Sequence, residues 1–165
     1  MASKLTEEQK QQLKQLEVLI GNPLNALDVY APFKRFEEYY ILVVDGNLHV
    51  KIQRTYGRVI TERILECRQL LPKCQFGTRL SKLQATESFL HSFATILGCV
   101  EFIVLHDVGV SINQGAELVM LIKEIRSQMG GFRKYLENSL ENCQNPEPTG
   151  EGSEQVKTKG SPALM

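Results

Sequence analysis

The sequence lacks the glycine-rich motifs that bind nucleotide phosphates. It contains neither GxxxxGKS nor GxxxxGKT, and no GxGxxG lies between an expected strand and an expected helix. In such motifs the backbone of a tight loop cradles phosphate groups. Their absence excludes the commonest modes of ATP and dinucleotide binding, although other modes of nucleotide binding stay open.

Histidine and cysteine are scarce and scattered. The three histidines are His49, His91 and His106, and none lies four residues from another. The four cysteines are Cys67, Cys74, Cys99 and Cys143, and they form no CxxC pair. Zinc sites use closely spaced ligands of these types. We therefore expect neither a metal nor a cofactor.

No apolar run follows Met1 that could serve as a secretory signal. Widely spaced cysteines in a chain of 165 residues favour free thiols in a reducing compartment over a disulfide framework. We therefore expect an intracellular protein of the cytoplasm, with the nucleus as the alternative.

The chain has no net charge, because 19 Lys and Arg balance 19 Asp and Glu. Residues 51–82 depart from this balance, with eight Lys or Arg against two Glu, whereas residues 1–50 and 83–165 are net acidic. Seven basic side chains of this segment are candidates for binding nucleic acid or another anion: Lys51, Arg54, Arg58, Arg68, Lys73, Arg79 and Lys82. The alternative is an ordinary solvated helix face.

The longest apolar segment covers residues 86–106 and has a helical period. One stripe repeats at helical spacing: Phe89, Phe93, Ile96, Leu97, Val100, Ile103 and Val104. The opposite side is also apolar from Ile96 onward, with Glu101 as its only charge. A helix that is apolar all round is buried all round. We predict a buried central helix and no transmembrane segment, because a bilayer needs about 20 predominantly apolar residues.

Two helical segments are predicted before the central helix. A capping box at Thr6 opens a peripheral helix that ends near Ile20. The segment 23–44 follows, with a break near Ala31 because Pro32 disfavours a continuous helix. An aromatic stripe in this segment is expected in the core: Tyr30, Phe33, Phe36, Tyr39 and Tyr40.

Two further helices are predicted from apolar stripes. One covers residues 48–71 and ends at Pro72, and the other covers residues 112–141 behind a capping box at Ser111. The pair Gly130-Gly131 inside the last helix indicates a kink or a close neighbouring helix.

The link between the segments 23–44 and 48–71 has two interpretations. The favoured one is a helix hairpin in which Gly46 is the left-handed cap. The alternative is a β-hairpin at residues 39–52, because Asp45-Gly46-Asn47 suits a tight turn and the apolar residues after it alternate. The sequence thus predicts an all-α bundle of five to six helices in residues 1–142. By composition, residues 143–165 are predicted to be a disordered tail.

Glu101 and Arg63 each interrupt an apolar pattern. A charge buried without a partner costs several kcal/mol. Because the two charges have opposite signs, we predict a buried ion pair between the central helix and the helix before it.

These observations favour a non-enzymatic helical interaction module or oligomeric subunit, which contacts a protein partner or a second copy of itself. One alternative is a helical protein that binds RNA or DNA through the basic segment 51–82. A second is a ligand-binding or catalytic bundle in which Glu101, His106 or Tyr40 line a pocket. No catalytic residue is assigned.

Overall fold

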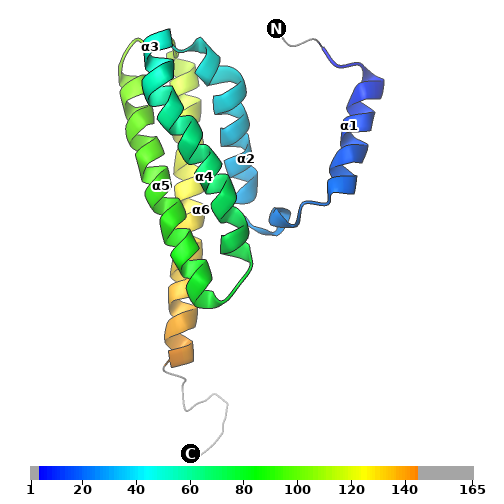
Figure 1. Ribbon diagram of the computed structural model, residues 1–165, viewed down its shortest axis with the longest axis vertical. Coiled ribbons are helices and arrows are strands. Elements are labelled where there is room, and N and C mark those ends of the chain that lie inside the picture. The colour runs from blue at the N-terminus through cyan, green and yellow to red at the C-terminus, as the bar shows by residue number, and fades with distance from the viewer. Residues whose placement is uncertain (1–3, 145–165) are drawn as a thin grey trace, which may run out of the picture.

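The computed structural model describes residues 4–144, and every regular element in that range is helical (Figure 1). The predicted all-α class is confirmed. The predicted tail lies outside the described residues, except that the last helix extends to Gln144.

Four helical segments run alternately up and down and form a bundle (Figure 1). Their parts, in chain order, are α2 (Tyr30–Tyr39) with the π-helical turn η2 (Tyr40–Val44); α3 (Val50–Ile52), the π-helical turn η4 (Gln53–Gly57) and α4 (Arg58–Gln75); α5 (Arg79–Leu105); and α6 (Ile112–Gln144). Helix α4 packs on α5, α5 on α6, and α6 on α2. Short connections join the segments that follow one another in the chain, as is usual in up-and-down bundles.

Both predicted capping boxes form. At the start of α1 (Glu7–Ile20), the backbone N–H of Gln9 donates to Thr6 Oγ1 at 3.1 Å, and the N–H of Thr6 donates to Gln9 Oε1 at 3.0 Å. Ser111 and Gln114 make the same reciprocal pair before α6. These bonds satisfy amide groups that every helix leaves unpaired at its N-terminus.

Helix α5 begins at Arg79, before the apolar segment 86–106 and before both possible caps in the sequence, Ser81 and Thr86. Thr78 caps it, because its Oγ1 accepts from the backbone N–H of Ser81 at 3.1 Å. Thr86 is instead fully buried inside the helix and donates its hydroxyl to the carbonyl of Lys82 at 2.8 Å.

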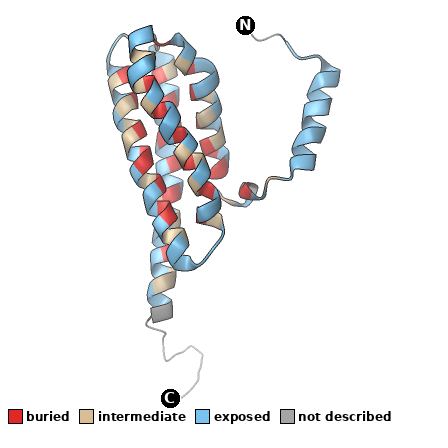
Figure 2. Cartoon of the chain, viewed as in Figure 1, coloured by how far each residue is buried: buried red, intermediate tan, exposed pale blue. Residues whose placement is uncertain are grey.

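The core lies between the four segments (Figure 2). Phe33, Phe36 and Tyr40 are fully buried, which confirms that the aromatic stripe belongs to the core. The ring centroids of Phe33 and Phe89 are 5.8 Å apart, and those of Phe36 and Phe93 are 5.4 Å apart. Aromatic contacts between α2 and α5 therefore fill the centre of the bundle.

The link between α2 and α3 contains no strand, so the helix hairpin is confirmed and the β-hairpin alternative at residues 39–52 is wrong. Gly46 lies in the 3-10 turn η3 (Asp45–Asn47) and is not left-handed, contrary to the prediction. A polar network closes the link instead. Tyr40 Oη donates to Asp45 Oδ1 at 2.9 Å, and Gln53 Nε2 donates to the carbonyl of Asp45 at 3.0 Å.

The two prolines interrupt the helices differently from the prediction. Pro72 lies inside the last turn of α4, which runs to Gln75. Pro32 lies in the first turn of α2, where its missing N–H would have no helical partner. The break therefore falls before Tyr30 and not at Ala31.

Helix α5 supplies much of the core. It was predicted to be buried on every side, and this prediction is wrong. Its outward face includes Glu101, which is exposed, and Leu105, which is 71% exposed. A bundle helix has neighbours on two flanks and the core on a third side, so one face stays open. Among the described helices, α5 alone is long and apolar enough to cross a membrane, but core helices of soluble proteins also meet that test.

Helix α1 stands apart from the bundle (Figure 1). All its residues are exposed, so the predicted peripheral position is confirmed (Figure 2). Gly21 ends it in the left-handed conformation, with φ of 53°, which glycine adopts without steric cost.

Candidate interaction surfaces

Helix α1 carries an apolar stripe that no described residue covers. Counting 100° per residue, four large side chains fall on one side: Leu13, Leu16, Leu19 and Ile20. Leu19 is 80% exposed and Ile20 is 73% exposed. An exposed ion pair at the edge of this stripe links the helix to α2, where Glu17 lies 3.5 Å from Lys34. A helix this short is marginal alone in water, so the stripe lacks the packing that usually stabilises an amphipathic helix.

The C-terminal end of α1 is fixed to the bundle by the short 3-10 helix η1 (Pro23–Ala26). Asn22 Nδ2 donates to Tyr30 Oη at 2.7 Å, and Gln75 Nε2 donates to the carbonyl of Pro23 at 2.9 Å. Leu24 is buried. The attachment point therefore lies where α2 begins and α4 ends.

A second apolar surface is a groove of about 440 Å³ along α5 and α6. Its lining residues are Ala94, Leu97, Gly98, Val100, Glu101, Val104, Leu105 and Val119. Glu101 is the only charged residue of this lining. Gly98 contributes no side chain, and nothing in the described structure lies within 4 Å of a Cβ built on it. The groove is thus shallow, apolar and open to a helix or a strand.

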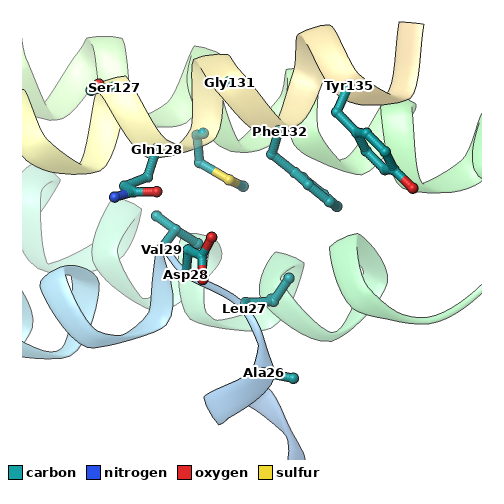
Figure 3. Close-up of a pocket in the computed structure, with 10 residues that line it drawn as sticks. Ala26, Leu27, Asp28, Val29, Ser127, Gln128, Gly131, Phe132 and Tyr135 are labelled. Atoms are coloured by element: carbon teal, nitrogen blue, oxygen red, sulfur yellow. The ribbon is translucent and has the colours of Figure 1, made fainter. Parts of the chain in front are cut away.

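A pocket of about 400 Å³ lies where the chain between η1 and α2 faces α6 (Figure 3). Leu27, Asp28 and Val29 face Phe132 and Tyr135 across it. Helix α6 runs unbroken through Gly130 and Gly131, and a Cβ built on either would meet no described atom within 4 Å. The close neighbour predicted for these glycines does not exist among the described residues, and Gly131 lines the pocket instead. The pocket lining contains no histidine, cysteine or lysine.

The predicted basic surface is divided. Lys51, Arg54 and Arg58 are exposed near the α3 end of the bundle, whereas Lys73 lies near the opposite end, beside the start of α5. Lys73 follows Lys51 by 22 positions, which is about 33 Å of helix. Arg79 and Lys82 belong to this second group.

Arg68 belongs to neither group, because it has a structural partner. Its Nε donates to Glu37 Oε2 at 2.7 Å, and its Nη2 donates to Glu37 Oε1. The guanidinium carbon lies 5.9 Å from the ring centroids of Tyr30 and Phe33. The hydrogen bonds to Glu37 raise the pKa of Arg68. Together with the ring contacts they tie α4 to α2.

The predicted buried pair of Arg63 and Glu101 does not form. Arg63 Nη1 donates to Glu66 Oε1 at 2.6 Å, one turn along its own helix, and both side chains are more than 40% exposed. Glu101 lies on the open face of α5. The prediction failed because it assumed that α5 is buried on all sides.

The polar residues weighed for a catalytic pocket do not converge. Tyr40 is buried against Asp45, and burial raises the pKa of its hydroxyl. His106 ends α5, with Nδ1 at 2.8 Å from the carbonyl of Phe102, and Glu101 lines the separate groove on α5 and α6. No group of three or more potential metal ligands occurs among residues 4–144.

Sequence reasoning missed both apolar surfaces, although their residues were visible. The apolar spacing of α1 is visible in the sequence, and the groove follows from the outward face of α5, which the sequence pattern assigns to the core. Comparisons with protein-family models, curated proteins and solved structures find no match to this chain.

Proposed function

We propose that the protein is a non-enzymatic interaction module whose helix α1 is a docking arm for another protein chain. The observation that carries this proposal is the uncovered stripe of Leu13, Leu16, Leu19 and Ile20 on a helix with no buried residue. An amphipathic helix gains most of its stability by packing that stripe. Another chain can supply the missing surface.

The charges of α1 favour a protein partner over a lipid surface. The helix carries three Glu and two Lys: Glu7, Glu8, Lys10, Lys14 and Glu17. Helices that lie in membrane interfaces are typically rich in Lys and Arg on the polar face. A helix with an acidic excess would be repelled by anionic lipid headgroups.

The nucleic-acid alternative receives less support from the geometry. Strong phosphate binding needs several cations that reach one backbone at the same time. Six of the seven candidate residues instead divide between the two ends of the bundle. The seventh, Arg68, is engaged with Glu37.

Photo-crosslinking from α1 in intact cells tests the proposal. A benzoylphenylalanine at position 16 lies on the apolar stripe, and the same group at position 11 lies on the opposite side of the helix as a matched control. We expect a covalent adduct with a protein chain from position 16 and little from position 11. Equal yields from the two positions, or adducts with lipid alone, would contradict a protein-docking arm.

A further inference from the structure

We infer that the partner of α1 is a second copy of this chain, and that α1 of each copy docks in the groove on α5 and α6 of the other. This inference rests on the proposed function and names the partner. The chain offers an amphipathic helix without a groove and an apolar groove without a helix. In a pair of copies, each helix would have a groove and each groove would hold a helix.

The groove of the same chain is out of reach of α1. Only Gly21 and Asn22 separate Ile20 from Pro23, which is held against Gln75 at the end of α4. This linker extends over about 11 Å at most, and the helix from Ile20 to Leu16, which would have to lie at Ala94, adds about 6 Å. Ala94, at the near end of the groove, lies 15 residues beyond Arg79, which is about 22 Å along α5. Helix α5 also packs between α4 and α6, on the side of the bundle away from the attachment point.

The dimensions of arm and groove agree. The 14 residues of α1 span about 21 Å, and the groove residues from Ala94 to Leu105 span about 16 Å. Ala94 and Gly98 lie one turn apart on the outward face of α5, where their small side chains leave room for large ones. Leucines of an approaching helix can therefore insert between the flanking Leu97, Val104 and Val119, as knobs fit into holes.

One register matches charge and shape together. With α1 antiparallel to α5, placing Lys10 beside Glu101 puts Leu13 over Gly98, because both pairs are three residues apart. Leu16 then lies close to Ala94. Lys10 lies about 60° around the helix from Leu13, at the edge of the apolar stripe. Glu101 is the only charge in the groove and has no ion pair among the described residues, so Lys10 supplies the complementary charge.

The exchange is reciprocal, which gives a closed dimer. Each copy donates one arm and accepts one, so the same surfaces meet twice around a two-fold axis. Neither an arm nor a groove is left to recruit a third copy.

The mass of the full chain in solution tests the dimer. We expect twice the chain mass of 18.7 kDa, and a return to the monomer mass for Leu13→Glu. Gln11→Glu, which adds the same charge on the opposite side of α1, should stay dimeric. Far-UV circular dichroism verifies that both variants keep the helical bundle.

Two results would overturn the inference. One is a chain that is monomeric at every concentration. The other is a dimer that Leu13→Glu leaves intact. Either would spare the proposed function if position 16 still crosslinked to a protein of different sequence in cells. Failure of that crosslink would remove the proposed function itself.

A disulfide between two copies tests the register. One tagged copy carries Leu13→Cys and a second carries Gly98→Cys, both with Cys99→Ala and Cys143→Ser to limit other pairings. We expect a mixed disulfide between the differently tagged copies under mild oxidation. Gln11→Cys paired with Gly98→Cys is the control and should crosslink at least tenfold less. Comparable yields would overturn the placement of α1 in this groove.

Discussion

Arg68 holds α4 against α2 through an ion pair and two aromatic contacts. Its guanidinium donates to the two carboxylate oxygens of Glu37 and lies 5.9 Å from the ring centroids of Tyr30 and Phe33. The side chain of Glu37 is 20% exposed and that of Arg68 is 35% exposed. Partial burial makes this pair stronger than a surface ion pair, because water screens it less.

We predict that Arg68→Ala destabilises the protein by about 1–3 kcal/mol, since it leaves the carboxylate of Glu37 partly buried without its partner. Urea unfolding followed by circular dichroism measures the change. Arg58→Ala is the control on the same helix, because Arg58 is exposed, and it should change stability by less than about 0.5 kcal/mol. Equal effects of the two substitutions would refute the structural role of Arg68.

Burial determines how the cysteines titrate. It raises the pKa of the Cys67 thiol to about 12 and also raises the pKa of Cys74. In the unfolded chain a thiol has a pKa of about 8.5. Above that value the unfolded state therefore binds fewer protons than the native state, so the free energy of unfolding falls as pH rises.

We predict that stability falls between about pH 9 and pH 12, by at most about 1.4 kcal/mol per pH unit for each such thiol. Urea unfolding at a series of pH values checks this slope. Cys67→Ala removes one titrating group, so its stability should fall less steeply with pH even though its stability at neutral pH is lower. A slope identical to that of the unmodified chain would show that Cys67 does not contribute.

At the scale of elements, the π-helical turns η2 and η4 meet at the polar network of Tyr40, Asp45 and Gln53. Gly57 ends η4 and is buried against this network. A Cβ at position 57 would lie 2.9 Å from Asp45 Oδ1 and 3.2 Å from Tyr40 Oη. The side chain of Asp45 would have to move, and the buried hydroxyl of Tyr40 would lose its acceptor.

We predict that Gly57→Ala is destabilising, because an unsatisfied buried hydroxyl costs about 1–3 kcal/mol and helix propensity returns only about 1 kcal/mol. Gly130→Ala is the matched control in α6, where a new Cβ has open space. It should stabilise the protein by about 0.5–1 kcal/mol. Thermal unfolding of both variants compares their stabilities. A gain of stability in Gly57→Ala would argue against the close packing of Gly57 on Asp45 and Tyr40.

Local signals predicted most elements. Thr6 and Ser111 are capping boxes in the sequence and in the structure, because a cap depends on residues within one turn. The aromatic stripe of α2 entered the core because its spacing leaves it on one side of a helix. The π-helical turns were not predictable in this way, since Tyr40 and Gln53 meet Asp45 only after the two helices fold against each other. Thr78 could have been identified as an N-cap from its residue type. It was missed because the apolar pattern of α5 begins several residues later.

At the scale of the whole molecule, the candidate surfaces depend on which helix faces the neighbouring helices cover, and a sequence pattern does not contain this information. Arg63 and Glu101 interrupt apolar stripes in the sequence. The neighbouring helices decide which flank of each stripe is exposed to solvent. The basic residues are close in sequence, yet the helical segment from α3 to α4 places Lys51 and Lys73 at opposite ends of the bundle. The exposed stripe of α1 could be read from the sequence as amphipathic, whereas its separation from the bundle could not.

Because α1 is separate from the bundle, we predict that the bundle folds without it. Among the described residues 4–20, deletion of residues 1–20 removes no buried side chain and only exposed ion pairs, such as that of Glu17 with Lys34. Exposed pairs contribute about 0–1 kcal/mol. The truncated monomer should therefore unfold at nearly the same urea concentration as the full chain measured at high dilution.

Deleting residues 1–28 is the matched comparison, because it also removes the buried Leu24 and the contact between Pro23 and Gln75. Loss of a buried leucine side chain costs about 2–5 kcal/mol, so this deletion should destabilise the bundle where the shorter one does not. If α1 docks on a second copy, the stability of the full chain should also rise with protein concentration, and that dependence should disappear in both deletions. A loss of more than about 2 kcal/mol on removing residues 1–20 from the monomer would show instead that α1 packs on its own bundle.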